Sequence, residues 1–151
     1  MNPSIKFTEQ AAALGAIPPQ SIAAGATVST AWIGSIGNFY ALAFEIKTGV
    51  LGTGATVDAK VQQATDATGT GAKDVSGAAI VQIVKASGDN VIAVINMKPQ
   101  DIDYNNGFAF VRLSVTVGTA ASLFDAVVFG VNPRQMSAEK LNAASVVQIV
   151  G

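Results

Sequence analysis

The sequence predicts an all-β protein, an antiparallel and jelly-roll-like β-sandwich with an extended N-terminal arm. Several segments alternate between apolar and polar residues, as expected for strands, in which successive side chains point to opposite faces. Short segments rich in Gly, Asn, Asp and Ser separate these runs, which is typical of a sandwich or barrel. A chain of 151 residues can bury roughly 70% of the surface that it exposes when unfolded, so no disulfide is needed.

Residues 1–20 differ from the rest and are expected to form an arm that leaves the domain of residues 21–151. An alanine-rich stretch is followed here by Pro18 and Pro19. A helix of one or two turns is expected from Thr8, which is a suitable N-cap residue. Because so short a helix is marginal in water, the arm is expected either to become ordered on a partner or to fray as chain termini often do.

Two kinds of strand are predicted within the domain. Apolar residues alternate with polar or charged ones in residues 57–62 and 111–117, which predicts one buried and one solvent-facing side. Four further segments are apolar on both faces and rich in valine or isoleucine: residues 79–84, 91–97, 122–131 and 144–150. The sandwich interior accounts for one face of these strands. The other face is either a subunit interface or part of the chain's own core, and the pattern leaves both open.

Two earlier strands are expected at residues 26–33 and 39–47. The second would place four large side chains on one face: Tyr40, Leu42, Phe44 and Ile46. A helical turn is expected at residues 137–141, between the last two strands. About eight strands fit two antiparallel sheets with Greek-key connections, as in a jelly roll. An immunoglobulin-like sandwich without the disulfide is the alternative.

Composition argues against most catalytic and ligand-binding chemistry. The chain has no histidine and no cysteine, so the commonest general base and metal ligands are absent, and we expect neither an enzyme nor a cofactor. The nine basic and ten acidic residues are scattered, so no stripe for nucleic acid is expected. No apolar run approaches the roughly 20 residues that span a bilayer, and polar residues interrupt any N-terminal export signal.

The low charge content favours protein contacts. Only 13% of the residues are charged, against about 25% in an average soluble domain. Surplus apolar surface on a chain without membrane-spanning segments indicates contact with other protein.

Local motifs have simple structural explanations. Residues 101–107 resemble the start of a calcium loop, but glycine is at the seventh position and Arg112 occupies the twelfth, where glutamate belongs, so a polar turn is expected and no metal. The glycine-rich residues 52–54 and 69–73 lack phosphate-loop spacing and are expected to be hairpin loops. Asp125 lies within an apolar run and is expected to pair with Arg112 or Arg134.

Residues 57–63, 74–80 and 110–118 resemble, in their strand pattern, small virion structural proteins of tailed bacteriophages, of the capsid decoration, cement or head-fibre-base type. The resemblance covers roughly residues 40–131. It implies a non-enzymatic β-sandwich that decorates and stabilises the capsid exterior after synthesis in the host cytoplasm. It also implies a symmetric homo-oligomer bound to the major capsid protein, with a trimer favoured and a pentamer possible.

The N-terminal arm and the C-terminal strand are the natural contact elements in such a protein. The expected partner contacts are Ile5, Phe7, Leu14, Ile17, Trp32, Val147 and Ile149. Trp32 and Tyr104 are also the two candidates for a sugar-binding platform, although core packing or a subunit contact explains them equally well. A carbohydrate- or receptor-binding module is therefore one alternative function, and a tail-tube or pilin-like polymerising subunit is another.

Overall fold

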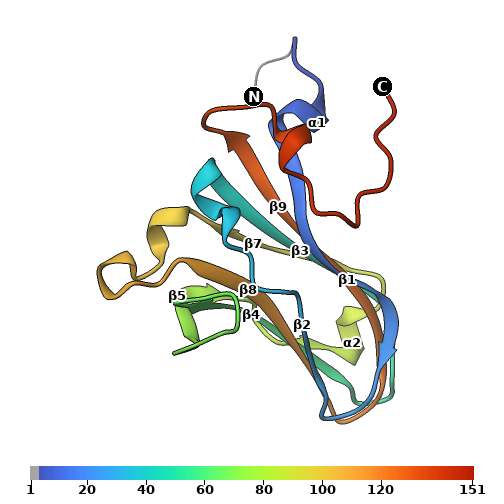
Figure 1. The fold of residues 1–151 in the computed structure, drawn as a ribbon. Helices are drawn as coiled ribbons and strands as arrows, with labels where there is room; N and C mark the ends of the chain where they lie inside the picture. Colours follow the sequence, from blue (N-terminus) through green and yellow to red (C-terminus); the bar gives the residue numbers. More distant parts are fainter. Residues whose placement is uncertain (1–3) are drawn as a thin grey trace.

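Two antiparallel sheets face each other in the computed structural model, which describes residues 4–151 (Figure 1). The first sheet has the order β1 (Ala11–Ile22), β9 (Ser122–Pro133), β3 (Phe39–Leu51) and β7 (Ile92–Met97). The second has the order β2 (Thr27–Ser29), β8 (Phe110–Gly118), β4 (Thr56–Ala64) and β5 (Lys73–Ala79), and β6 (Ile83–Val84) also pairs with β4. The predicted all-β antiparallel sandwich is confirmed.

Short helices lie between the strands and at both ends of the chain of strands. They are α1 (Phe7–Gln10), η1 (Ser35–Asn38), α2 (Lys85–Gly88), η2 (Pro99–Asp101), η3 (Tyr104–Asn106) and η4 (Ala138–Leu141). The helical turn expected at residues 137–141 is therefore confirmed. Helix α1 begins one residue before Thr8, and the carboxylate of Glu9 accepts the Lys6 N–H at 2.8 Å, so Thr8 is not the N-cap. No helix among residues 4–151 is long and apolar enough to cross a membrane.

The core lies between the sheets and is built largely by the alternation of inward and outward side chains along the strands. Val57, Val61 and Val111 are fully buried, whereas their neighbours Asp58 and Arg112 lie on the outer face. This confirms the two strands that were expected to have one polar face. Residues 69–71 lie in the β4–β5 connection, which joins two paired antiparallel strands, as expected for a hairpin loop. The same expectation is wrong for residues 52–54, because β3 and β4 belong to different sheets and their connection crosses between the sheets.

The structure places residues 11–20 in a sheet rather than in an arm. They belong to β1, which pairs with β9 from Ala11 to Ile22. Pro18 and Pro19 are tolerated because β1 is an edge strand and its register shifts between Ile17 and Gln20, where no ladder donor is needed. The expected boundary after residue 20 therefore falls inside a strand.

Other expected elements are shorter or absent. Residues 144–150 form no strand. The C-terminal segment is instead hydrogen-bonded to β1 just before these residues, where Ala13 bonds to Asn142 and Ala143. The chain leaves the sheet between β5 and β6, where Val81 is 91% exposed. The strand expected at residues 26–33 is reduced to β2. Tyr40 is 55% exposed and does not share the buried face of Leu42, Phe44 and Ile46.

Candidate interaction surface

The outer faces of the two sheets differ in chemistry. On the second sheet the outward side chains of the central strands are polar or charged: Thr56, Asp58, Lys60, Gln62, Arg112, Ser114 and Thr116. On the first sheet the outward side chains are mostly apolar or small: Ala41, Ala43, Val127, Phe129, Val131, Ile92 and Val94. The register places Ala43 beside Phe129 and Ala41 beside Val131. We call the outward side of the first sheet the apolar face.

The apolar face is most exposed toward its edge. Val127 and Phe129 on the central strand β9 are half-buried, whereas Ile92 and Val94 on the edge strand β7 are 65% and 49% exposed. Leu123, near one end of β9, is 46% exposed. It borders a shallow hollow of about 380 Å³, whose lining also includes Pro19, Gln20, Lys47 and Asp125.

One ion-pair cluster interrupts the apolar face. The Nζ atom of Lys47 lies 3.3 Å from Asp125 and 3.6 Å from Glu45. The hydrogen bond to Asp125 is the main reason why the pKa of Lys47 is raised. The expected pairing of Asp125 with an arginine is wrong, because the β3–β9 register sets Asp125 opposite Lys47 on the outer face.

The two arginines have other partners. Arg112 donates two hydrogen bonds to Gln62, at 3.0 and 2.9 Å, and covers the ring of Trp32 at 4.5 Å. Arg134 donates to the carbonyl oxygen of Phe39 and lies 4.3 Å from the ring centre of Tyr40. Both guanidinium groups therefore have structural contacts on the chain's own surface.

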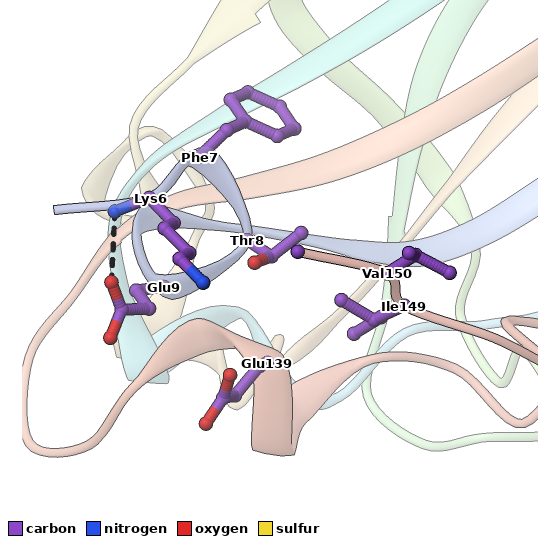
Figure 2. Close-up of a pocket in the computed structure, with 8 residues that line it drawn as sticks. Lys6, Phe7, Thr8, Glu9, Glu139, Ile149 and Val150 are labelled. Carbon is purple, nitrogen blue, oxygen red and sulfur yellow. Dashed lines mark hydrogen bonds between the residues drawn. The ribbon is translucent and has the colours of Figure 1, made fainter.

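A second exposed apolar region lies where α1 meets the C-terminal segment. In Figure 1 the helix and the final residues lie at the same end of the sandwich. Phe7 packs edge-on against Phe129, with ring centres 6.3 Å apart. Figure 2 shows the neighbouring hollow of about 750 Å³, which α1 and Glu139 line together with Ile149 and Val150. We call the exposed residues of this region the terminal surface: Ile5, Phe7, Met136, Val147, Ile149 and Val150.

The structure divides six of the seven predicted partner contacts into two groups, and Trp32, which is half-buried, belongs to neither. Four of them belong to the terminal surface: Ile5, Phe7, Val147 and Ile149. Phe7 and Ile149 line the same hollow, so residues far apart in sequence are brought together. Leu14 and Ile17 cannot contact a partner in this fold, because they are 9% and 1% exposed on the inner face of β1.

The two aromatic candidates for a sugar-binding platform differ in their exposure. Trp32 is half-buried, one face of its ring is covered by Arg112, and a Cβ atom at Gly69 would lie 2.6 Å from its Nε1 atom. Tyr104 is 47% exposed, and partial burial raises the pKa of its hydroxyl. The ring of Trp32 is therefore less accessible to the flat face of a sugar than a sugar-binding platform requires.

Acidic side chains are engaged in local structure. Asp101 accepts the Lys98 N–H at 2.8 Å, and Asp103 pairs with Lys73 at 2.7 Å and with the amide of Asn106. The pKa of Asp103 is lowered, chiefly by Lys73. Within residues 4–151 no group of three or more acidic side chains could hold a metal ion. The segment that resembles a calcium loop is thus a helical turn with its own hydrogen bonds.

The apolar face was only partly foreseen from the sequence. Residues 91–97 and 122–131 are apolar on both sides, which indicated a second covered face. The pattern does not reveal that β7 and β9 lie in one sheet on either side of β3. Strand order depends on long-range pairing, so Ile92, Val94 and Leu123 could not be grouped in advance.

No protein-family model and no curated protein sequence matches the chain. Among solved structures, a chain of infectious bursal disease virus, Gt strain, has a TM-score of 0.46 and 11% identity; the match covers 92% of this chain and 37% of that one. A chain from naturally occurring empty particles of cowpea mosaic virus has a TM-score of 0.43 and 9% identity, and the match covers 87% of this chain and 94% of the viral chain. A family 22 carbohydrate-binding module of Clostridium thermocellum Xyn10B has a TM-score of 0.38 and 13% identity, and the match covers 82% of this chain and 86% of the module.

These similarities are loose. The first match spans little more than a third of the viral chain.

Proposed function

We propose that the chain is a non-enzymatic virion structural protein that decorates and stabilises the outer surface of a tailed-phage capsid as a symmetric homo-oligomer. The observation that carries the proposal is the contrast between the polar outer face of the second sheet and the apolar face of the first. Contiguous exposed apolar surface with a polar surround is typical of protein contact sites. The assignment to a phage virion rests on the sequence resemblance.

A stabilising subunit needs contacts with its own copies and with the shell. We assign the apolar face to neighbouring copies and the terminal surface to the major capsid protein. Phe7, Val147 and Ile149 supply large exposed side chains for the shell contact. Binding only to the assembled shell would stabilise that state by mass action, and repetition on a lattice would add avidity.

Co-sedimentation tests the shell contact. The purified protein is mixed with assembled shells, and separately with unassembled subunits, of the major capsid protein encoded in the same genome. We expect it to sediment with assembled shells only. The double variant Phe7→Asp and Val147→Asp should weaken shell binding at least tenfold, because charges replace exposed apolar contacts. Val81→Asp is the matched control, since Val81 is 91% exposed but lies outside the terminal surface.

The outcomes separate the candidate functions. Failure of the protein to sediment with assembled shells would contradict the capsid role. Saturable binding on a glycan array that is lost in Tyr104→Ala would favour the carbohydrate-binding alternative instead. Open-ended growth into fibres or tubes would favour a polymerising subunit.

A further inference from the structure

Strand β7 is the sheet edge that lacks protection against pairing with another strand. Natural sheet edges are usually blunted by shortness, proline, charge, bulges or cover. Edge strand β1 carries Pro18 and Pro19 and two register shifts, and Ala13 is already bonded to the C-terminal segment. Strand β2 has three residues. Strand β5 begins with Lys73 and Asp74 and contains Gly77 at φ +76°.

Strand β7 has no proline, charge or bulge and is not unusually short. Its six residues, Ile92–Met97, include no charge, proline or glycine and pair with β3 without a register shift. Its outward side chains Ile92, Val94 and Asn96 are exposed, whereas Val127 and Phe129, outward side chains in the middle of the covered strand β9, are half-buried. We infer that β7 pairs with β7 of a second copy of this chain, antiparallel and about a two-fold axis.

The ladder defines which groups are free to pair. The N–H of Thr48 donates to the carbonyl of Val91 at 2.9 Å, so Val91 points its backbone groups toward β3. In an antiparallel ladder, successive residues bond to opposite sides. The backbone N–H and C=O groups of Ile92, Val94 and Asn96 therefore point to the open edge. These are also the residues whose side chains lie on the apolar face.

A two-fold axis through Val94 uses all of these groups. Val94 then pairs with Val94 of the second copy, and Ile92 pairs with Asn96 on either side, so every outward residue of one copy exchanges two hydrogen bonds with the other. The strand pair is self-complementary, as a two-fold contact requires. The apolar faces of both copies become one continuous sheet surface.

The contact is small. Six residues of strand span about 20 Å, so the buried area falls in the lower range of specific interfaces, where complexes are transient. The inference rests on the self-association within the proposed function and does not involve the shell. It adds a two-fold contact beside the threefold or fivefold contacts that the sequence resemblance implies.

Cysteine cross-linking tests the register in the full chain, which has no cysteine of its own. Bonded antiparallel pairs have Cα atoms about 5.5 Å apart, within disulfide range. Val94→Cys should form covalent dimers under mild oxidation with diamide. Ile92→Cys alone should not, whereas a mixture of Ile92→Cys and Asn96→Cys should give the mixed dimer. Val81→Cys is the matched exposed control and should stay monomeric.

Analytical ultracentrifugation tests the same contact without cross-links. Val94→Lys should raise the dimer dissociation constant at least tenfold, and Val81→Lys should change it less than twofold. Wild-type protein that is monomeric at millimolar concentration, or Val94→Lys that dimerises normally, overturns the inference. Cross-linking of Ile92→Cys to itself overturns the register. Binding to the capsid shell is measured in a separate experiment. A negative result for the β7 contact therefore does not decide whether the chain binds capsids.

Discussion

The ring of Phe39 packs directly on Gly130 of the neighbouring strand. A Cβ atom at Gly130 would lie 2.5 Å from the Cδ2 atom of Phe39, and the Phe39 side chain is fully buried. Gly130→Ala should therefore destabilise the fold by about 1–3 kcal/mol, as expected when a filled core is overpacked. Urea unfolding measures the difference.

Gly37→Ala is the control for this substitution. No atom lies within 4 Å of a Cβ at Gly37, so the free energy of unfolding should change by less than about 0.5 kcal/mol. Equal effects at Gly37 and Gly130 would show that the Phe39 contact is not the cause.

Thr48 ties the start of β7 to β3 from a buried position. Its hydroxyl donates to the carbonyl of Gly88 and accepts the Val91 N–H at 3.1 Å. Thr48→Val keeps the shape but leaves both backbone groups unsatisfied, so it should cost about 1–3 kcal/mol. Thr48→Ser, which keeps the hydroxyl, should recover most of that loss in the same unfolding measurement. A valine variant as stable as wild type would contradict the role assigned to this hydroxyl.

Asp66 organises the loop between β4 and β5. One carboxylate oxygen accepts the N–H groups of Thr68 and Thr70, at 2.9 and 3.1 Å, and the hydroxyl of Thr68. Hydrogen bonds from Thr70 and Thr68 hold the pKa of Asp66 well below its usual 3.8. Because the folded pKa is lowered, the contribution to loop stability is present above about pH 4 and is lost progressively as the pH falls toward the folded value.

Amide hydrogen exchange checks this pH dependence. Protection of the Thr68 and Thr70 amides should be lower in Asp66→Ala than in wild type at pH 7, and the difference should shrink at pH 2.5. Asp66→Asn should keep part of the protection and lose its pH dependence, since the amide oxygen still accepts hydrogen bonds without titrating. A difference that is the same at both pH values would contradict the mechanism.

Phe7 fastens α1 to the sheet through Phe129. An edge-on aromatic pair contributes about 0.5–1.5 kcal/mol beyond its buried area, and Phe7 is 58% exposed. Phe7→Ala should therefore speed hydrogen exchange in α1 and in residues 143–146 while changing global stability by less than about 1 kcal/mol. Phe7→Leu keeps an apolar contact, so its hydrogen-exchange rates in α1 should lie between those of wild type and of Phe7→Ala. Unchanged exchange in α1 would show that the ring contact does not hold the helix.

Much of the fold follows from side-chain alternation. Val57, Val61 and Val111 alternate with polar neighbours, and both segments are strands with one polar face. Residues 11–20 were mistaken for an arm because alanine and proline are poor strand formers. β1 nevertheless forms because Ala12, Leu14 and Ile17 fill the core and β9 supplies the ladder. Tertiary packing overrides local propensity there.

The interaction surface was harder to predict. Val147 and Ile149 were expected on a strand, and they lie instead, exposed, on a segment without regular secondary structure. Asp125 pairs with Lys47 because of the β3–β9 register, which depends on contacts far apart in sequence. Periodicity identifies strands with two apolar faces, but strand order decides which of them share a surface.

Multi-angle light scattering across a wide concentration range tests directly whether the chain associates with its own copies, because it measures the mass of the unmodified protein. If the apolar face is a contact between copies, the mass should rise with concentration to the value of one defined, closed oligomer and return on dilution. A monomer at millimolar concentration would contradict the account, and so would growth without a limiting mass.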